Sequence, residues 1–298
     1  MSPAAPGYLA PEGEPSSGVA DPTADRSQNA SGAPVRRVRV QDLARAKAQG
    51  RRLTMLTAYD ALIAPILESA GVDMLLVGDS LGNVVLGHTS TLPVTLGDME
   101  RATAAVARST SRALVVADLP FGTYEADPAQ AFANAARLMQ AGAHAVKLEG
   151  GQPRATTVRL LAEGGIPVVG HLGYTPQSEH MIGGPRMRGR GDQREQMLRD
   201  ALALQEAGAV ALVLEMVPAD LAGEVTASLR IPTIGIGAGP DTDGQVLVWS
   251  DMAGMGDGAP SFGRRFAELG AALHAAARDY VQAVGEGSFP AEGNFHAH

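Results

Sequence analysis

Short apolar runs alternate along the chain with longer segments in which Ala and Leu recur at helical spacing. Eight of the runs have the length and composition of buried strands. They are LTMLT (53–57), DMLLVG (73–78), ALVVAD (113–118), AVKLE (145–149), IPVVGH (166–171), ALVLE (211–215), IPTIG (231–235) and VLVW (246–249). Strands and helices in alternation form a parallel sheet, either a closed barrel or a doubly wound sheet. Eight βα units, and no glycine-rich turn after the first strand, favour an α/β fold of the (β/α)8 TIM-barrel class.

Two of the intervening segments also carry the signals of helix ends. Asp127-Pro128 has the pattern of an N-cap followed by proline in the first helical position. The segment that begins at Arg194 ends in a glycine, Gly208, which is the residue typical of a helix C-terminus. We therefore expect helices from about residue 128 and from about residue 194.

The first 35 residues differ in composition from the rest of the chain. They are rich in Pro, Gly, Ala and Ser and contain few branched apolar residues, so they bury too little surface to offset the entropy of ordering. We predict a disordered N-terminal tail at 1–35 and a single catalytic barrel domain at 36–298.

Composition and charge narrow the classes of partner. The 298 residues are 45% apolar and carry 24 basic against 32 acidic side chains, which disfavours nucleic acid and anionic membranes. The absence of cysteine suits a reducing cytosol, and neither a membrane-length apolar run nor a signal-peptide pattern is present. We expect a soluble, cytoplasmic protein whose partners are small molecules.

Four of the predicted strands lead into a carboxylate. These residues are Asp79, Asp118, Glu149 and Glu215. Catalytic groups of a (β/α)8 barrel lie at the C-terminal ends of its strands, so the four side chains should share one acidic site. Carboxylate oxygens suit Mg²⁺, which usually takes one or two of them together with water and substrate oxygens. Asp79 and Asp118, on neighbouring strands, are the first candidates for such a site, although either could instead cap a helix or form a turn.

The remaining candidates surround this acidic group. Lys147 and Glu149 should point to the same side of their strand, as a catalytic pair or as a self-satisfied ion pair. Glu215 follows the apolar ALVL, so dry surroundings would suit a general base. Ser80 could donate to a substrate carboxylate or cap a helix. His171, at the end of the fifth strand, is either a substrate contact or a structural histidine.

Two glycine-containing segments carry weaker signals. GIGAG at 235–239 is more consistent with a tight turn than with a dinucleotide site. The segment IGGPRMRGRGDQR contains Arg186, Arg188, Arg190 and Arg194. Such a basic loop is either solvated or a lid that recognises an anionic co-substrate.

Several motifs together resemble one enzyme family. They are LTAYD from Leu56, GDSLGNVVLGH from Gly78, STLPVT from Ser90, ADLPFGTYE from Ala117, VKLEGG from Val146, GHLGYTPQS from Gly170, LEMVP from Leu214 and IGIGAGPDTDGQVLV from Ile234. In this order, over about residue 36 to the SFP near the C-terminus, the chain closely resembles the ketopantoate hydroxymethyltransferases.

The resemblance implies a Mg²⁺-dependent (β/α)8 barrel that transfers a one-carbon unit from 5,10-methylenetetrahydrofolate to 3-methyl-2-oxobutanoate. This step belongs to pantothenate and coenzyme A biosynthesis, and the family assembles as a homodecamer of two stacked pentamers. By motif, Asp79 and Asp118 are associated with both metal and substrate, and Glu149 supports the metal. Ser80 and Lys147 hold the oxo acid, and Glu215 is the catalytic base.

The chain departs from the family pattern at two places. Thr89 replaces the aspartate of GHDSTLPVT, and in GGPRMRGR, Pro185 and Arg188 replace an aromatic residue and a glutamine. These changes leave open a paralogue that acts on another 2-oxo acid. Two further functions stay open: a Mg²⁺-dependent lyase or aldolase that needs no folate, and a non-catalytic binding barrel.

Overall fold

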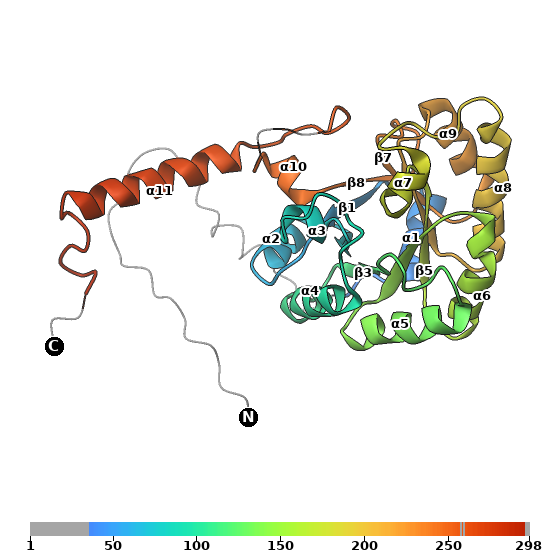
Figure 1. Ribbon diagram of the computed structural model, residues 1–298, viewed down its shortest axis with the longest axis horizontal. Coiled ribbons are helices and arrows are strands. Elements are labelled where there is room, and N and C mark those ends of the chain that lie inside the picture. Colours follow the sequence, from blue (N-terminus) through green and yellow to red (C-terminus); the bar gives the residue numbers. More distant parts are fainter. Residues whose placement is uncertain (1–35, 257, 259, 296–298) are drawn as a thin grey trace. The chain divides into compact units, whose positions relative to one another are not determined.

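Eight parallel strands close into a barrel in the computed structural model, which describes residues 36–256, 258 and 260–295. Each strand pairs with its neighbours in sequence, and the last pairs with the first (Figure 1). The strands are β1 (Leu53–Thr57), β2 (Met74–Val77), β3 (Leu114–Asp118), β4 (Ala145–Glu149), β5 (Val168–Gly173), β6 (Ala211–Glu215), β7 (Thr233–Ile236) and β8 (Gly244–Leu247). The predicted (β/α)8 barrel is thereby confirmed.

Helices connect most of the strands and cover the outside of the barrel (Figure 1). The α-helices are α1 (Val40–Ala48), α2 (Ile63–Ser69), α3 (Leu81–Val84), α4 (Leu96–Ser109), α5 (Pro128–Gln140), α6 (Ala155–Glu163), α7 (Glu179–Ile182), α8 (Gln193–Glu206), α9 (Ala219–Ser228), α10 (Trp249–Ala253) and α11 (Leu269–Gly285). Two 3₁₀ turns, η2 (Gln152–Arg154) and η3 (Pro176–Ser178), precede α6 and α7.

Both predicted helix-end signals are confirmed. The Asp127 side chain accepts a hydrogen bond from the Ala129 amide, and Pro128 is the first residue of α5. Beyond α8, Gly208 has a φ of +103°, which a residue with a Cβ adopts only with strain.

The expected regularity is wrong at the last two strands. No helix lies between β7 and β8, because the Gly- and Pro-rich residues 237–243 leave room only for a turn. The expected strand at 246–249 begins two residues earlier, and Trp249 instead starts α10. An apolar run does not mark its own boundaries, and this one continues across the junction of strand and helix.

Two apolar layers account for the alternation of side chains along the strands. Inward-facing residues such as Leu76, Val116 and Val213 form a cluster inside the barrel. Outward-facing residues such as Val115 and Leu148 pack beneath the surrounding helices. This alternation also decides which side chains at the strand ends point into the barrel mouth.

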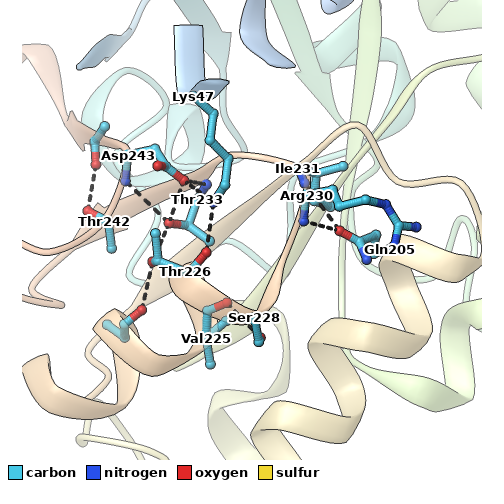
Figure 2. Close-up of polar contacts among 12 residues, drawn as sticks. Lys47, Gln205, Val225, Thr226, Ser228, Arg230, Ile231, Thr233, Thr242 and Asp243 are labelled. Carbon is cyan, nitrogen blue, oxygen red and sulfur yellow. Dashed lines mark hydrogen bonds and ion pairs between the residues drawn. The ribbon is translucent and has the colours of Figure 1, made fainter. Parts of the chain in front are cut away.

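Helix α1 closes the end of the barrel opposite the C-terminal ends of the strands. Its Leu43 and Ala46 are buried in the inner cluster. Lys47 donates to Asp243 and to the Thr226 carbonyl, at 2.8 and 2.7 Å, as Figure 2 shows. Asp243 also accepts from the Thr233 amide at 2.9 Å. This end of the barrel is thus occupied by structural contacts, which leaves the opposite end for chemistry.

Residues 1–35 lie outside the described part of the chain, so the tail and its boundary stay predictions. Among the residues that are described, no helix combines the length and the apolar character needed to cross a membrane.

Candidate active site

Strand register places the predicted acidic residues beside one another at the barrel mouth. Asp118, Glu149 and Glu215 end β3, β4 and β6, and Asp79 follows β2 by two residues. In the parallel pairing, Asp118 is the partner of Lys147, and Glu149 is the partner of His171. The sheet therefore brings together side chains that lie more than a hundred residues apart in sequence.

These groups line a cavity of about 330 Å³ at the C-terminal ends of the strands. Each candidate named from the sequence contributes to its lining: Asp79, Ser80, Asp118, Lys147, Glu149, His171 and Glu215. Apolar side chains complete the wall: Leu76, Val213, Ile236, Val246, Leu247 and Val248. A small ligand with one charged and one aliphatic end would match this division.

Lys147 and Asp118 form a buried ion pair, with Nζ and Oδ1 2.9 Å apart. Burial alone would lower the pKa of Lys147, but the negative charges of Asp118, Glu149 and Asp79 outweigh it and raise that pKa. Lys147 is therefore a cation in the cavity, and its role as a nucleophile is disfavoured.

Asp79 lies in surroundings that disfavour a negative charge on its side chain. Burial, together with repulsion from Asp118 and Glu149, raises the pKa of Asp79 to about 8. Its main-chain amide donates to Asp118 Oδ2 at 3.0 Å, and its own Oδ2 accepts from Gln177 Nε2 at 2.8 Å. Asp79 lies in the turn before α3, as one of its alternative interpretations predicts, but its side chain and that of Asp118 bond across strands and do not cap a helix.

His171 lies between two carboxylates. Its Nδ1 is 3.2 Å from Glu149 Oε1, and its Nε2 is 3.2 Å from Glu215 Oε2. Both are ion-pair distances rather than well-aligned hydrogen bonds, since Glu149 Oε1 and His171 Nε2 lack a hydrogen-bond partner. Burial and the charge of Lys147 lower the pKa of His171, but the two carboxylates outweigh them and raise it to about 9.

Glu215 is less buried than its sequence context predicts, with 17% of its side chain exposed to the cavity. Its backbone is held closely: the carbonyl oxygen accepts from the Tyr174 amide, and a Cβ on Gly173 would collide with that oxygen. The next residue, Met216, has a φ of +49°, a conformation rarely adopted by residues with a side chain. Strain of this kind is typical of functional sites.

Ser80 occupies the predicted N-cap position, but its hydroxyl does not cap the helix that follows. Ser80 is the N-cap residue of α3, yet its side chain makes no capping hydrogen bond. Its Oγ instead lies 2.8 Å from the Tyr59 hydroxyl. Burial raises the pKa of Tyr59 to about 12, so this hydroxyl stays neutral behind Ser80, which lines the cavity.

Unpaired polar atoms concentrate in this cavity. Within the described part of the chain, six buried side-chain atoms lack a hydrogen-bond partner, and four of them belong to residues of the cavity wall. They are Thr91 Oγ1, Asp118 Oδ1, Glu149 Oε1 and His171 Nε2. The last three lie 2.9, 3.2 and 3.2 Å from an ion-pair partner but form no aligned hydrogen bond. Buried polar atoms are usually satisfied, so such a cluster indicates a ligand site.

The acidic group suits a metal ion that is shared with a substrate. Among the described residues, no group of three or more His, Cys, Asp or Glu side chains is placed so that its members could hold a metal ion by themselves. Asp118 Oδ1 and Glu149 Oε1 nevertheless make no aligned hydrogen bond, although each lies near a cation, Lys147 or His171, and repulsion from both carboxylates helps to raise the pKa of Asp79. Because Mg²⁺ commonly takes few protein carboxylates and completes its shell with water and substrate oxygens, these residues fit it.

The basic loop reaches the cavity at only some of its residues. Thr89 and Pro185, two positions where the chain departs from the family pattern, both line the wall. The Arg188 amide donates to the Met216 carbonyl at 2.9 Å, which fastens the loop next to Glu215. The prediction that Arg194 belongs to the basic loop is wrong. This residue lies in α8 and forms ion pairs with Asp220 and Glu224 on α9. It is therefore not part of a lid.

Two buried polar residues behind the carboxylates, Gln177 and Tyr124, are not among the candidates predicted from the sequence. Gln177 bonds Asp79, and the Tyr124 hydroxyl accepts from the Glu149 amide at 3.1 Å. Gln177 and Tyr124 belong to the TPQ and TYE segments of the family motifs. No rule of sequence spacing predicts that loops after two different strands meet, so their contact with the carboxylates was not expected.

Solved structures of low sequence identity share the fold. A phosphonopyruvate hydrolase crystallised with oxalate and Mg²⁺ has a TM-score of 0.57 at 14% identity, over 86% of this chain and 92% of that one. 2,3-Dimethylmalate lyase, a member of the PEP mutase/isocitrate lyase superfamily, has a TM-score of 0.56 at 19% identity, over 87% and 91%. At these identities the likeness concerns the fold alone.

Sequence relatives are much closer. The 3-methyl-2-oxobutanoate hydroxymethyltransferase of Acidothermus cellulolyticus is 56% identical over 257 residues, which cover 86% of this chain and 95% of the relative. The protein of the same name from Corynebacterium glutamicum is 54% identical over 264 residues, or 88% and 98% of the two chains. The family model described as ketopantoate hydroxymethyltransferase matches residues 37–292. The chain therefore belongs to the ketopantoate hydroxymethyltransferase family, a family of transferases.

Proposed function

We propose that this protein transfers a hydroxymethyl group from 5,10-methylenetetrahydrofolate to 3-methyl-2-oxobutanoate, which gives 2-dehydropantoate (ketopantoate). The reaction serves pantothenate and coenzyme A biosynthesis in the cytoplasm. The observation that carries the proposal is the convergence of a cationic lysine, a carboxylate group and a separate glutamate, Glu215, around a largely apolar cavity. The names of the family and its relatives support the oxo acid and the hydroxymethyl group as reactants, and the folate rests on the resemblance in the sequence motifs.

The cavity matches the oxo acid in shape and polarity. Val213, Ile236 and Val246 offer an apolar surface for the isopropyl group in the cavity that the charged side chains also line. Ser80 lines the cavity and supplies a hydroxyl group for the substrate carboxylate, with Tyr59 behind it at 2.8 Å. The cavity of about 330 Å³ has room for the oxo acid and the reacting end of the folate, so most of the folate must lie outside it.

Removal of the C3 proton is the step assigned to Glu215. This glutamate is open to the cavity, and its backbone is clamped between Gly173 and the strained Met216. A fixed base within reach of the substrate lowers the barrier to proton transfer. The carbanion that forms is delocalised as an enolate, and its C3 bonds to the one-carbon unit of the co-substrate. Both methylene–nitrogen bonds of the folate break, one water supplies the hydroxyl group of the product, and the proton taken from C3 and the second proton of the water pass to the two folate nitrogens.

Negative charge that develops on the 2-oxo oxygen is met by Lys147. The pKa of this lysine is raised by three carboxylates, so it acts as a fixed positive charge rather than as a Schiff-base amine. When bound, Mg²⁺ would polarise the 2-oxo group as a Lewis acid. Asp79, Asp118 and Glu149 are the residues that would hold it, with Glu149 directly or through water.

Deuterium exchange tests metal, substrate and base together. We expect the protein with Mg²⁺ in D₂O to exchange the C3 proton of 3-methyl-2-oxobutanoate, as followed by NMR, before any folate is added. Addition of 5,10-methylenetetrahydrofolate should then produce ketopantoate. Exchange or cleavage products without any folate-dependent product would favour a lyase or aldolase. No Mg²⁺-dependent reaction with any branched oxo acid would favour a non-catalytic barrel.

The preferred oxo acid depends on residues that differ from the family pattern. Thr89 and Pro185 both line the cavity, so the departures occur where a substrate side chain would be read. This observation favours, as a second candidate, activity on a related 2-oxo acid. Comparison of kcat/KM for 2-oxo acids with straight, branched and longer side chains distinguishes the two candidates.

We further propose that the protein assembles as a homodecamer of two stacked pentamers. In support of an assembly, α11 has no buried residue and exposes a row of large apolar side chains: Leu269, Leu273, Tyr280, Val281 and Val284. An apolar surface of this kind usually belongs to an interface. Light scattering after size-exclusion chromatography measures the assembly, and a monomer at micromolar concentration would refute it.

A further inference from the structure

Gln177 is a buried amide whose hydrogen-bonding groups are all used within the site. It lies in η3, after β5, and is only 5% exposed. Nε2 donates to Asp79 Oδ2 at 2.8 Å and to the Leu119 carbonyl at 3.0 Å, and Oε1 accepts from the Tyr124 hydroxyl at 2.5 Å. Its main-chain amide donates to Glu149 Oε2 at 3.1 Å. One residue thus holds two of the three carboxylates.

Tyr124 determines which way the Gln177 amide faces. Its hydroxyl oxygen accepts a hydrogen bond from the Glu149 amide at 3.1 Å, so its single hydrogen is directed to Gln177 Oε1. A flipped amide would place its oxygen against two acceptors, Asp79 Oδ2 and the Leu119 carbonyl. The direction of each hydrogen bond in the network is therefore fixed.

The network divides the oxygens of each carboxylate between two tasks. Gln177 ties Asp79 Oδ2 and Glu149 Oε2 to the protein. Glu149 Oε1 makes no aligned hydrogen bond and lies 3.2 Å from His171 Nδ1, and within the described residues Asp79 Oδ1 makes no hydrogen bond. One oxygen of each group is thereby anchored to Gln177, and the other belongs to a side chain that lines the cavity.

We propose that Gln177 and Tyr124 are positioning residues that orient Asp79 and Glu149 for a divalent cation and its bound oxo acid. The inference rests on the proposed function, because it assigns these two carboxylates to the metal. Partners behind metal ligands commonly change metal affinity roughly 10- to 100-fold when they are removed. A purely structural role for the same network would change stability and leave the metal affinity unaltered.

The test measures binding of Mn²⁺, used as a probe for Mg²⁺, by the loss of the free-ion EPR signal in the complete protein without substrate. We expect Gln177→Met, which keeps the volume but not the hydrogen bonds, to weaken binding roughly 10- to 100-fold. Tyr124→Phe should weaken it less, about 10-fold, because the amide remains and loses only its orientation. Thermal unfolding followed by circular dichroism monitors the fold of each variant.

Gln205 provides a matched control. It is also a buried glutamine, 8% exposed, and its Oε1 accepts from the Arg230 and Ile231 amides at 2.5 and 3.2 Å. These contacts precede β7, at the end of the barrel opposite the cavity (Figure 2). Gln205→Met should therefore lower the unfolding temperature, as the loss of buried hydrogen bonds does, and leave Mn²⁺ affinity within about twofold of wild type.

Asp79→Asn separates the inference from the function on which it rests. If it weakens Mn²⁺ binding and both Gln177→Met and Tyr124→Phe do so as well, the positioning role is supported. If Asp79→Asn weakens binding while the other two variants stay within twofold of wild type and remain folded, Gln177 and Tyr124 have only a structural role. If Asp79→Asn itself has no effect, the assigned metal site is wrong, and the positioning role is wrong with it.

If Gln177→Met does not fold, two other variants decide by the same measurement. They are Tyr124→Phe and Gln177→Asn, which moves the amide by one methylene.

Discussion

Glu215 Oε2 lies 3.2 Å from His171 Nε2, where neighbouring strands β6 and β5 end. The same imidazole is 3.2 Å from Glu149 through Nδ1, so it occupies the space between the proposed base and the proposed metal site. A base and a metal ligand that share one neighbour must be tested separately, because loss of either group would abolish turnover.

Glu215→Gln should remove proton abstraction and preserve the cavity, because the amide keeps the shape of the side chain but does not accept the C3 proton. We expect C3 deuterium exchange, followed by NMR, to fall roughly 10²- to 10⁴-fold. Binding of 3-methyl-2-oxobutanoate in the presence of Mg²⁺, measured by calorimetry, should be largely unchanged. Exchange at the wild-type rate would exclude Glu215 as the base.

Asp79→Asn and Asp118→Asn should each raise the Mg²⁺ concentration needed for half-maximal exchange, because each removes a charged oxygen from the set that would hold a hard cation. Excess Mg²⁺ should restore activity more fully in Asp79→Asn than in Asp118→Asn. Asp118 is also the ion-pair partner of Lys147, at 2.9 Å, and its loss alters that cation as well. An unchanged Mg²⁺ requirement in either variant would remove that aspartate from the metal site.

The fold and the candidate site differ in how much of each follows from the sequence. Apolar runs with period-two alternation identify strands, and carboxylates at their C-terminal ends converge because parallel strands share that edge. Lys147 and Glu149 can therefore be placed together from the sequence, and both line the cavity. The exception is the eighth strand, whose apolar run continues into Trp249 at the start of α10.

Contacts that depend on the paths of loops could not be predicted in this way. Gln177 reaches Asp79 from a loop 98 residues away in sequence, and no periodic signal reports such a contact. The positive φ of Met216 is equally hidden, since methionine gives no hint of a left-handed conformation. The neighbours of Arg194 in sequence indicate a basic loop, whereas its ion pairs with α9 assign it to helix packing.

His144 should make stability depend on pH away from the cavity. Its Nδ1 accepts from the Val115 amide at 3.0 Å, and burial together with the charge of Arg37 lowers its pKa to about 4. Between pH 6.5 and 4 the unfolded chain therefore binds a proton that the folded chain does not, so the free energy of unfolding decreases as the pH falls through this window. Partial exposure of the ring limits the change to on the order of 1 kcal/mol.

Urea unfolding at pH 7 and pH 5 measures this effect. His144→Asn keeps an acceptor near the Val115 amide but does not titrate, so its stability should change less between the two pH values. Replacement of the exposed His180 by Asn is the control and should leave the pH dependence as in wild type. Equal pH dependence in wild type and His144→Asn would show that other groups control acid unfolding.

The basic loop should affect the folate step and spare the exchange step. Arg186, Arg188 and Arg190 lie between the cavity residue Pro185 and α8, where they could meet the anionic glutamate part of a folate that extends out of the cavity. Replacement of all three by Ala should raise the KM for 5,10-methylenetetrahydrofolate, more strongly for polyglutamylated forms, and high salt should mask the difference. Arg194→Ala is the matched control, because that arginine pairs with Asp220 and Glu224, and it should leave this KM unchanged.

C3 exchange needs only oxo acid, metal and base, so it should survive the triple substitution. Equal loss of both activities in a folded triple variant would assign the loop to closure over the oxo acid instead of to folate recognition.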